Sequence, residues 1–275
     1  MTVDPPQQLR DPERLANEPD ATFWSDADQV YVSVFVGARR YLVWDEYLSG
    51  LQACYSALGV DHIVTDELVR PEDCSLVWLI HDRDWRIVGG ARAVGPFLDR
   101  SDVANVPAAS EFAGSSSESS LREQLADLIE DGGLIEVKGG WTHRSQRGLG
   151  SVVGCFGWFC TWWFGVRHAL ATAGGENNLR RWEETGARRL VDVEPLVGHP
   201  AAAYDTEPML WSRRNLDGVP DRHRAFLWTA IRQLHGARSR EMGVVDLPEL
   251  VHRPERIAHL QANGVQLVDQ TDALA

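Results

Sequence analysis

The segment from Leu134 to Val166 constrains the fold of this 275-residue chain more than any other part of the sequence. It begins with LIEVKGGW, which indicates a strand, passes through the polar turn THRSQR, and enters a run of 18 uncharged residues at Leu149–Val166. Eighteen apolar residues are close to the minimum length of a membrane-spanning helix. Because four glycines, a serine and a threonine dilute this run and no second one exists, we expect a helix buried inside a folded domain rather than a membrane span.

Hydrophobic patterns in the rest of the chain predict a succession of strands and helices. Apolar residues alternate in the predicted strands and recur every three or four residues in the predicted helices. Strands are predicted for residues 29–38, 74–82, 86–95, 134–141, 169–173, 189–195 and 207–214, and helices for residues 40–58, 121–129, 150–168, 177–185 and 221–236. The two strands within residues 74–95 are expected to pair as a hairpin, whereas the turn-rich residues 96–120 are expected to form a long loop.

The charge distribution excludes one broad class of function. The net charge is −13, and a nucleic-acid-binding protein needs a basic face to neutralise phosphates. Acidic residues predominate in residues 1–30 and 99–131, whereas residues 132–215 contain eight acids and ten bases. Nucleic acid is therefore not an expected partner, and the centre of the chain is where a small anion is expected to bind.

The cysteines and the N-terminal residues indicate the cellular compartment. Four cysteines (Cys54, Cys74, Cys155 and Cys160) form no C-x-x-C pair and lie among apolar residues. Free thiols in a reducing compartment are therefore expected, and no bound metal is predicted. The first residues, MTVDPPQQLRDPER, lack the apolar core of a secretory signal, so a cytoplasmic location is expected.

The residues between the predicted central strand and the long helix form a candidate anion site. A helix N-terminus exposes unpaired backbone N–H groups with a partial positive charge, and glycines let a phosphate approach them closely. The segment RSQRGLGS, residues 144–151, combines such glycines with two arginines. It matches neither G-x-x-x-x-G-K-[ST] nor G-x-G-x-x-G, so sites for nucleoside triphosphates and dinucleotides are not supported.

This strand, turn and helix resemble the GNAT superfamily of acyl-CoA-dependent N-acyltransferases. The family signature [RQ]-x-x-G-x-[GA] is matched by Gly148 and Gly150, while Ser145 occupies the Arg or Gln position, with Arg144 and Gln146 on either side of it. Downstream, NNLRRWEETGARRL resembles the family's N-x-x-A-x-x-L-Y-x-x-x-G-F element, with a tryptophan at the tyrosine position. The order of predicted elements is similar over residues 29–214.

The resemblance implies a fold, a domain organisation and a cofactor site. The implied fold is of the α/β (α+β) class, with a mixed, mostly antiparallel central sheet flanked by helices. The implied domains are an N-terminal tail at residues 1–28, a GNAT-like domain at residues 29–215 and a helical C-terminal extension at residues 216–275 packed on it. Acyl-CoA would be the co-substrate, without a metal. The implied coenzyme A contacts are Gly139, Gly140, Trp141, Arg144, Gln146, Arg147, Gly148, Leu149, Gly150, Ser151, Asn178 and Trp182.

Three side chains are candidates for the proton transfers of such a reaction. Glu136 is the first candidate for the base, because it shares one face of the central strand with Lys138, the only lysine in the chain. A purely structural pair with Lys138 or an arginine is the alternative. His143, in the turn, is the second candidate for the base. Trp182 stands where the family has its tyrosine acid, so Tyr204 is the candidate acid, and protonation by water is the alternative.

A narrower resemblance connects the chain with acyl-homoserine-lactone synthases and N-acyl amino acid synthases. The stretch SLVWLIHDRDWRIVGGARAVGP is similar to their hairpin, and it implies substrate contacts from Arg92 and Lys138, with Glu136 as their strand glutamate. The serine and arginine of their second motif are absent, so a lactone product is not expected. Relatives with long acyl chains often use acyl carrier protein, which this acidic chain would repel unless an arginine patch docks it (Arg180, Arg181, Arg188 and Arg189).

These observations lead to three hypotheses about function. The first is direct acylation, with acetyl expected, of the amine of a small molecule or amino acid by acyl-CoA. The second is long-chain acyl transfer from acyl carrier protein, for which Trp158, Trp162 and Trp163 would line a tunnel unless they are ordinary core residues. The third is a GNAT-like module that binds a ligand without catalysis. A homodimer is compatible with each hypothesis.

Overall fold

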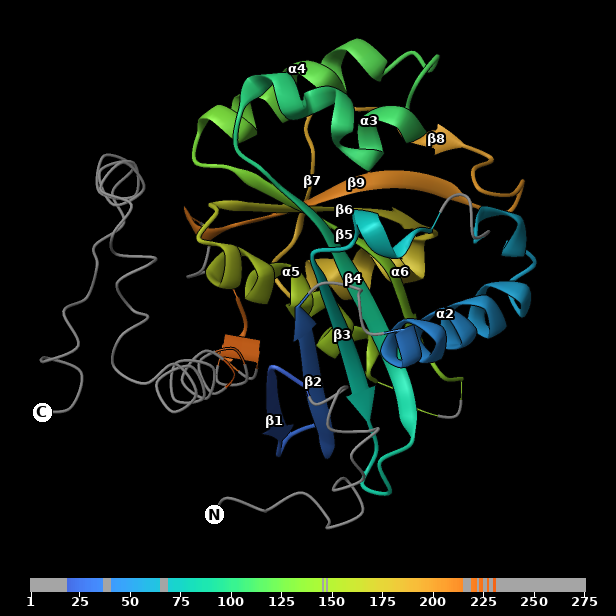
Figure 1. Ribbon diagram of the computed structural model, residues 1–275. Coiled ribbons are helices and arrows are strands. Elements are labelled where there is room, and N and C mark those ends of the chain that lie inside the picture. The colour runs from blue at the N-terminus through green and yellow to red at the C-terminus, as the bar shows by residue number, and fades with distance from the viewer. Residues whose placement is uncertain are drawn as a thin grey trace, which may run out of the picture.

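The described part of the chain forms one mixed sheet with helices on both faces (Figure 1). The computed structural model describes residues 19–36, 41–64, 69–144, 146, 148–214, 219–221, 223, 224, 227 and 230. The strands are β1 (Ala21–Ser25), β2 (Val30–Val36), β3 (Leu76–His81), β4 (Ile87–Phe97), β5 (Leu134–Thr142), β6 (His168–Gly174), β7 (Arg188–Arg189), β8 (Leu196–Val197) and β9 (Asp205–Ser212). The helices are α2 (Tyr41–Ser56), η2 (Asp61–Ile63), η3 (Pro71–Asp73), η4 (Arg100–Asn105), α3 (Pro107–Glu111), α4 (Glu118–Glu130), α5 (Gly150–Phe164) and α6 (Glu176–Glu183).

The strand pairing confirms the predicted fold class. The strands lie in the order β1-β2-β3-β4-β5-β6-β9-β7, and β8 pairs with β9. Every described pair of strands is antiparallel except β5 and β6, which run parallel. A parallel pair needs a long crossover connection, and α5 forms that crossover.

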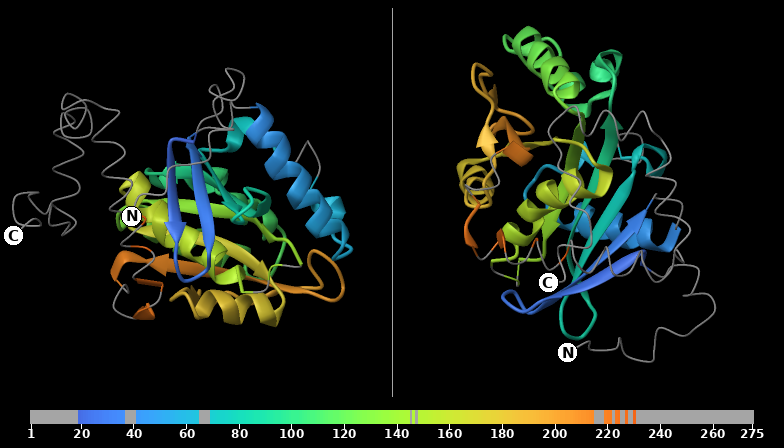
Figure 2. Two further views of the ribbon diagram at one scale, coloured as in Figure 1. Left: turned by 90° about the horizontal axis from the view of Figure 1, so that it is seen from below. Right: turned by 90° about the vertical axis from the view of Figure 1, so that its left-hand side faces the viewer.

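The two faces of the sheet carry different helices. Alternate residues of β3 point to opposite faces, so Val77 and Leu79 pack with α2 while Trp78 and Ile80 pack with α5. Helices α3 and α4 cover the face that α2 covers, but at the other end of β5. Figure 2 shows α2 and α6 on opposite sides of the sheet.

Helix α5 is the buried helix that the uncharged run predicts. Trp158, Phe156 and Phe159 are fully buried, and the rings of Phe156 and Phe159 contact each other and Trp78 on β3. The indole N–H of Trp158 donates to the carbonyl of Thr185 at 2.7 Å, which satisfies a polar group that burial would otherwise leave unpaired. These aromatic side chains are therefore core residues. None of the described helices has both the length and the apolar character that crossing a membrane requires.

The region predicted as a long loop at residues 96–120 is instead largely helical, so that prediction is wrong. Asp99 and Asp102 form a capping box at the start of η4, in which the Asp102 carboxylate accepts from the Asp99 N–H at 3.1 Å. The Asp99 carboxylate also accepts from the Ser101 N–H at 2.8 Å. Pro107 then begins α3, at a position where its missing N–H is no loss. The serines and glycines suggested a loop, but these capping residues decide the local structure.

Two other boundaries differ from expectation. Residues 21–25, assigned to the tail, form β1, which pairs with β2 and buries Phe23 against Trp78 and Phe159. The strand predicted at residues 189–195 is only the two-residue β7, and Asp192 turns the chain with a φ of 62°. Most of the predicted helix at residues 221–236 and of the C-terminal extension at residues 216–275 lies outside the described residues.

Candidate active site

Strands β5 and β6 separate after their first three residues. They pair from Leu134 with His168 as far as Glu136 with Leu170. Beyond those residues β5 continues to Thr142 and β6 to Gly174, but the two strands no longer pair with each other. The edges of both strands that face this gap therefore have no ladder partner across it.

A bulge in β5 lies beside this gap. In the ladder with β4, Trp141 pairs with Gly90 and Lys138 pairs with Arg92, so the two residues Gly139 and Gly140 stand opposite the single residue between Gly90 and Arg92. This is the β-bulge that the glycine pair predicts.

Gly139 is required at its position for two reasons. Its φ is 57°, in the left-handed region, and a Cβ there would lie 2.2 Å from the Tyr47 hydroxyl of α2. That hydroxyl donates to the Gly139 carbonyl at 3.0 Å. Helix α2 therefore holds the bulge in place through one buried tyrosine.

A charged cluster bridges the gap where the strands separate. The Nζ atom of Lys138 on β5 donates to Oε2 of Glu111 at 2.7 Å and to the Thr172 hydroxyl on β6 at 3.0 Å. The same Nζ lies 3.4 Å from Oε1 of Glu136. Three elements, α3, β5 and β6, thus meet at one ammonium group.

Burial and charge together set the protonation of this cluster. Burial raises the pKa of Glu136, and the Lys138 ammonium opposes that rise. Burial would also raise the pKa of Glu111, but Lys138 and two hydrogen bonds hold it below its usual range. Burial would lower the pKa of Lys138, yet the carboxylates of Glu111 and Glu136 raise it above its usual value. Lys138 is therefore a cation and Glu111 an anion at neutral pH.

Arg92 adds a second cation on the same face. It is 5% exposed and pairs with Lys138 in the β4–β5 ladder. Burial raises the pKa of the Tyr47 hydroxyl, and the nearby charge of Arg92 opposes that rise. Its Nε atom has no hydrogen-bond partner among the described residues. Two cations and the two glutamates thus nearly balance in charge, so the cluster does not form a strong anion site by itself.

Glu136 forms an ion pair with Lys138, the structural pairing that the sequence analysis gave as the alternative to a role as the base. Its side chain is fully buried, Oε2 accepts from the backbone N–H of Ala108 at 2.9 Å, and Oε1 faces Lys138. A substrate amine has no access to this carboxylate in this conformation.

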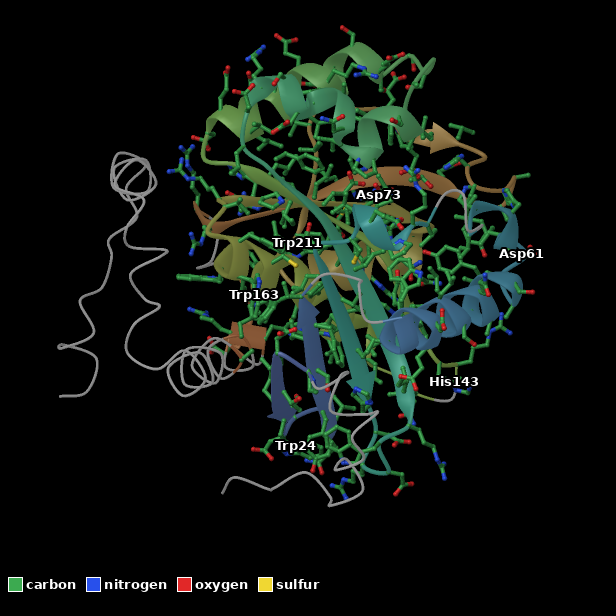
Figure 3. The ribbon with its side chains drawn as sticks, viewed as in Figure 1. Trp24, Asp61, Asp73, His143, Trp163 and Trp211 are labelled. Atoms are coloured by element: carbon green, nitrogen blue, oxygen red, sulfur yellow. The ribbon has the colours of Figure 1, made fainter. Side chains whose placement is uncertain are left out.

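The other two proton-transfer candidates lie away from Glu136. His143 follows β5, seven residues after Glu136, which at the usual rise of a strand places it roughly 23 Å away. Figure 3 shows His143 below α2, and its neighbour Thr142 accepts from the Cys54 thiol near the C-terminal end of that helix. Tyr204 lies against Gly174 and Gly175, where β6 ends. Tyr204 therefore borders the gap, whereas His143 lies beyond it.

The predicted anion site is the N-terminus of α5. Leu149 precedes the helix without a side-chain cap, and the Ser151 hydroxyl donates to the Gly148 carbonyl at 3.0 Å. Gly148 has a φ of 94° and no atom within 4 Å of its Cβ position, so its surroundings are open. The first N–H groups of α5 precede the 3.1 Å bond from Val153 N to Leu149 O, and helix geometry leaves them without an intrahelical acceptor.

The arginine beside this N-terminus is not one that the turn motif predicted. The side chain of Arg181, from α6, lies 3.2 Å from the Cβ position of Gly150 and is exposed. The guanidinium of Arg144 instead donates to the Ala57 carbonyl after α2. Ser145 and Arg147 lie outside the described residues.

The remaining predicted cofactor contacts have structural partners. The Gln146 N–H donates to the His143 carbonyl at 2.9 Å, and the Asn178 amide donates to Gly174 O at 3.0 Å. Trp182 is half-buried and its ring lies 5.4 Å from that of Trp211.

Trp141 lines an open depression beside α2. This depression has a volume of about 410 Å³ and is lined by Asp45, Glu46, Ser49, Gly50, Ile87 and Trp141. Its two carboxylates disfavour a phosphate there.

Sequence patterns missed three residues of the charged cluster. Glu111, Thr172 and His199 lie 27 to 88 residues from the groups they contact. His199 Nε2 lies 3.2 Å from Oε1 of Glu111. No motif in the sequence marks these three residues, because their contacts depend on how α3, β6 and the loop after β8 assemble.

No protein-family model matches the chain, and no curated protein matches it. Solved structures that are similar to it include an N-acyl amino acid synthase from uncultured soil microbes (10% identity, 68% of this chain and 92% of that chain, TM-score 0.47). A CoA-dependent acyl-homoserine lactone synthase matches with 19% identity over 70% of this chain and 88% of its own, at a TM-score of 0.41. Spermidine N-acetyltransferase from Vibrio cholerae matches with 9% identity over 67% and 97%, at a TM-score of 0.39. The matches thus include both classes of protein that the sequence motifs resemble.

Proposed function

We propose that this protein is a GNAT-type N-acyltransferase that moves an acyl group from acyl-CoA to the amino group of a small molecule. The observation that supports this most directly is the separation of β5 and β6 after Glu136, with a bulge at Gly139–Gly140 on one side of the gap. Unpaired strand edges supply backbone donors and acceptors to an extended ligand, as a missing strand would. The pantetheine arm of coenzyme A is such a ligand.

The N-terminus of α5 suits the other end of the same cofactor. Its first N–H groups and the exposed guanidinium of Arg181 provide the donors and the positive charge that a pyrophosphate needs. Because α5 follows β5 after a short turn, a donor bound there would extend along β5 toward Lys138. In this arrangement the thioester lies near the charged cluster.

Direct transfer requires little from the protein. The amine nitrogen attacks the thioester carbon, a C–N bond forms, and the C–S bond breaks. The amine proton passes to a base, and the leaving thiolate takes a proton from Tyr204 or from water. Backbone N–H groups beside the bulge would stabilise the oxyanion.

Two structural features bear on the donor. Trp158, Phe156 and Phe159 of α5 are packed in the core and Trp163 packs against it, which supports a short acyl group such as acetyl over a long chain in a tunnel along α5. Arg180 and Arg181 are exposed on α6, and this favours a carrier protein as the second candidate donor.

Calorimetry with coenzyme A and acetyl-CoA tests the donor site. We expect binding by the wild-type chain and a loss of at least tenfold in affinity for Arg181→Glu. Arg86→Glu is the matched control, because Arg86 is an exposed arginine on the turn between β3 and β4. Equal losses in both variants, or no binding by the wild type at millimolar coenzyme A, would contradict the proposed site.

Amine-dependent release of thiol from acyl-CoA tests the activity itself. Acetyl-CoA, longer acyl-CoAs and acyl carrier protein are compared with a panel of amines and amino acids. A carrier-protein enzyme would respond to Arg181→Glu only with the protein donor. Binding of coenzyme A without thiol release with any amine would instead support a ligand-binding module.

A further inference from the structure

We propose that His199 is the general base of this site and that Glu111 orients it. This inference rests on the proposed acyl transfer and names a residue that the sequence motifs do not indicate. It is carried by a continuous chain of contacts, which runs from the gap between β5 and β6 through Glu111 to a histidine at the surface of the cluster.

The two oxygens of Glu111 have different partners. Oε2 accepts from Lys138 at 2.7 Å and from the Thr172 hydroxyl at 2.9 Å, which ties it to β5 and β6. Oε1 lies 3.2 Å from Nε2 of His199. A carboxylate held this way on one side accepts a ring N–H on the other side, and so selects the orientation and the tautomer of the imidazole.

The loop after β8 holds His199 in place by its backbone. The Thr206 hydroxyl on β9 donates to the His199 carbonyl at 2.7 Å. The preceding residue, Gly198, donates its N–H to Oδ1 of Asp205 at 3.0 Å. Strand β9 therefore fixes the backbone at His199 while Glu111 on α3 holds its imidazole, which gives the ring the support that a catalytic base needs.

Access distinguishes His199 from Glu136. The side chain of His199 is 38% exposed, against 20% for Lys138, 18% for Glu111 and 0% for Glu136. His199 is thus the most exposed of these four side chains and the one that an amine can reach without displacing α3. Glu136 serves as the buried counter-charge of Lys138.

The proton follows a simple route. With its Nε2–H directed at Glu111, His199 offers the Nδ1 lone pair to the amine. Nδ1 takes the amine proton as the C–N bond forms, and Glu111 stabilises the resulting imidazolium. The thiolate takes its proton from Tyr204 or from water as the C–S bond breaks, and the imidazolium then gives its proton to that tyrosinate or hydroxide, so the base is regenerated without any other reactant.

The charged and titratable groups around His199 come from several elements. Glu111 on α3 and Asp205 on β9 are acidic, Lys138 on β5 is basic, and His62 of η2 contacts the Pro200 carbonyl at 3.0 Å. Protonation of His199 removes its lone pair, so the rate is expected to fall on the acidic side of the pH profile.

The test compares His199→Gln with His62→Gln in the full chain. His62 is an exposed histidine that adjoins the same loop but forms no ion pair with the described residues. With acetyl-CoA and the best amine of the panel, we expect His199→Gln to lower kcat by about 10²–10⁴-fold and to leave the KM for acetyl-CoA within threefold. The acidic limb of the pH profile should disappear in His199→Gln, while His62→Gln keeps wild-type values within threefold.

The outcomes separate this inference from the proposed function. Wild-type thiol release that depends on an amine supports the proposed function whatever the variants do. If His199→Gln then keeps its rate or its acidic limb, or if His62→Gln loses as much, His199 is not the base. If the wild type releases no thiol, both proposals are overturned together. Thermal unfolding of both variants verifies that a lost rate does not reflect a lost fold.

Discussion

The Nζ atom of Lys138 lies 2.7 Å from Oε2 of Glu111, although the two residues are 27 positions apart and belong to a strand and a helix. This ion pair connects α3 to β5 at the point where β5 leaves β6. The only lysine of the chain thus stands at the centre of the proposed site.

Replacing Lys138 by methionine should destabilise the protein by about 3–5 kcal/mol, because it leaves the largely buried carboxylates of Glu111 and Glu136 without their counter-charge. Urea unfolding at neutral pH measures this difference. Lys138→Arg retains the charge and should lower the free energy of unfolding clearly less than Lys138→Met does. Equal losses in both variants would mean that packing rather than charge holds the cluster together.

The two glutamates around Lys138 should respond to pH in opposite directions. The pKa of Glu111 is lowered on folding, so its ionisation contributes stability that is present above its unfolded pKa near 4.5 and is lost as the pH falls below that value. The pKa of Glu136 is raised, so its ionisation costs stability as the pH rises above 4.5. Just above pH 4.5 Glu136 therefore holds its proton in the native state more than in the unfolded state, and stability falls as the pH rises.

Urea unfolding of Glu111→Gln and Glu136→Gln between pH 3 and pH 8 checks these signs. The deficit of Glu111→Gln relative to wild type should grow as the pH rises. The stability of Glu136→Gln relative to wild type should improve as the pH rises. Parallel pH dependences in the two variants would contradict the assignment of Glu111 as the group whose pKa is lowered on folding and of Glu136 as the group whose ionised form burial disfavours.

Substitution of Gly139 by alanine should destabilise the protein by more than the cost of a left-handed backbone conformation alone, because it also disturbs the bulge. A left-handed backbone costs a residue with a Cβ roughly 1–2 kcal/mol, and the clash with the Tyr47 hydroxyl should add about 1–3 kcal/mol. Gly59→Ala is the matched control, since Gly59 has a φ of 73° and no atom within 4 Å of its Cβ position. Equal losses in the free energy of unfolding for Gly139→Ala and Gly59→Ala would show that the Tyr47 hydroxyl moves aside at no cost in free energy.

Gly50→Ala should reverse the usual effect of alanine in a helix. Alanine in place of a helical glycine ordinarily stabilises by about 0.5–1 kcal/mol. At Gly50 of α2, however, the new Cβ would lie 2.1 Å from the buried indole of Trp141, so we expect a net loss of roughly 1–2 kcal/mol. Ser49→Ala, on the exposed side of the same helix, should change stability by less than about 0.5 kcal/mol.

Local pattern predicted the elements that carry the candidate donor site. The uncharged run from Leu149, together with Gly148 and Gly150 on either side of that residue, predicts a buried helix behind an open N-terminus, and Gly139–Gly140 predict a bulge. Each of these features depends on residues close together in the chain, where the spacing of apolar residues and the backbone conformations open to glycine determine the local structure. The helices at residues 100–111 were missed because a few capping residues outweighed a composition typical of loops.

The sequence by itself determined that Glu136 and Lys138 share one face of β5, because side chains of a strand alternate with period two. Only the tertiary structure decided what covers that face. Helix α3 places Ala108 on Glu136 and Glu111 on Lys138, and the loop after β8 places His199 on Glu111. Burial and long-range contacts depend on the assembly of distant elements, so His199 could be proposed as the base only after these elements were seen together.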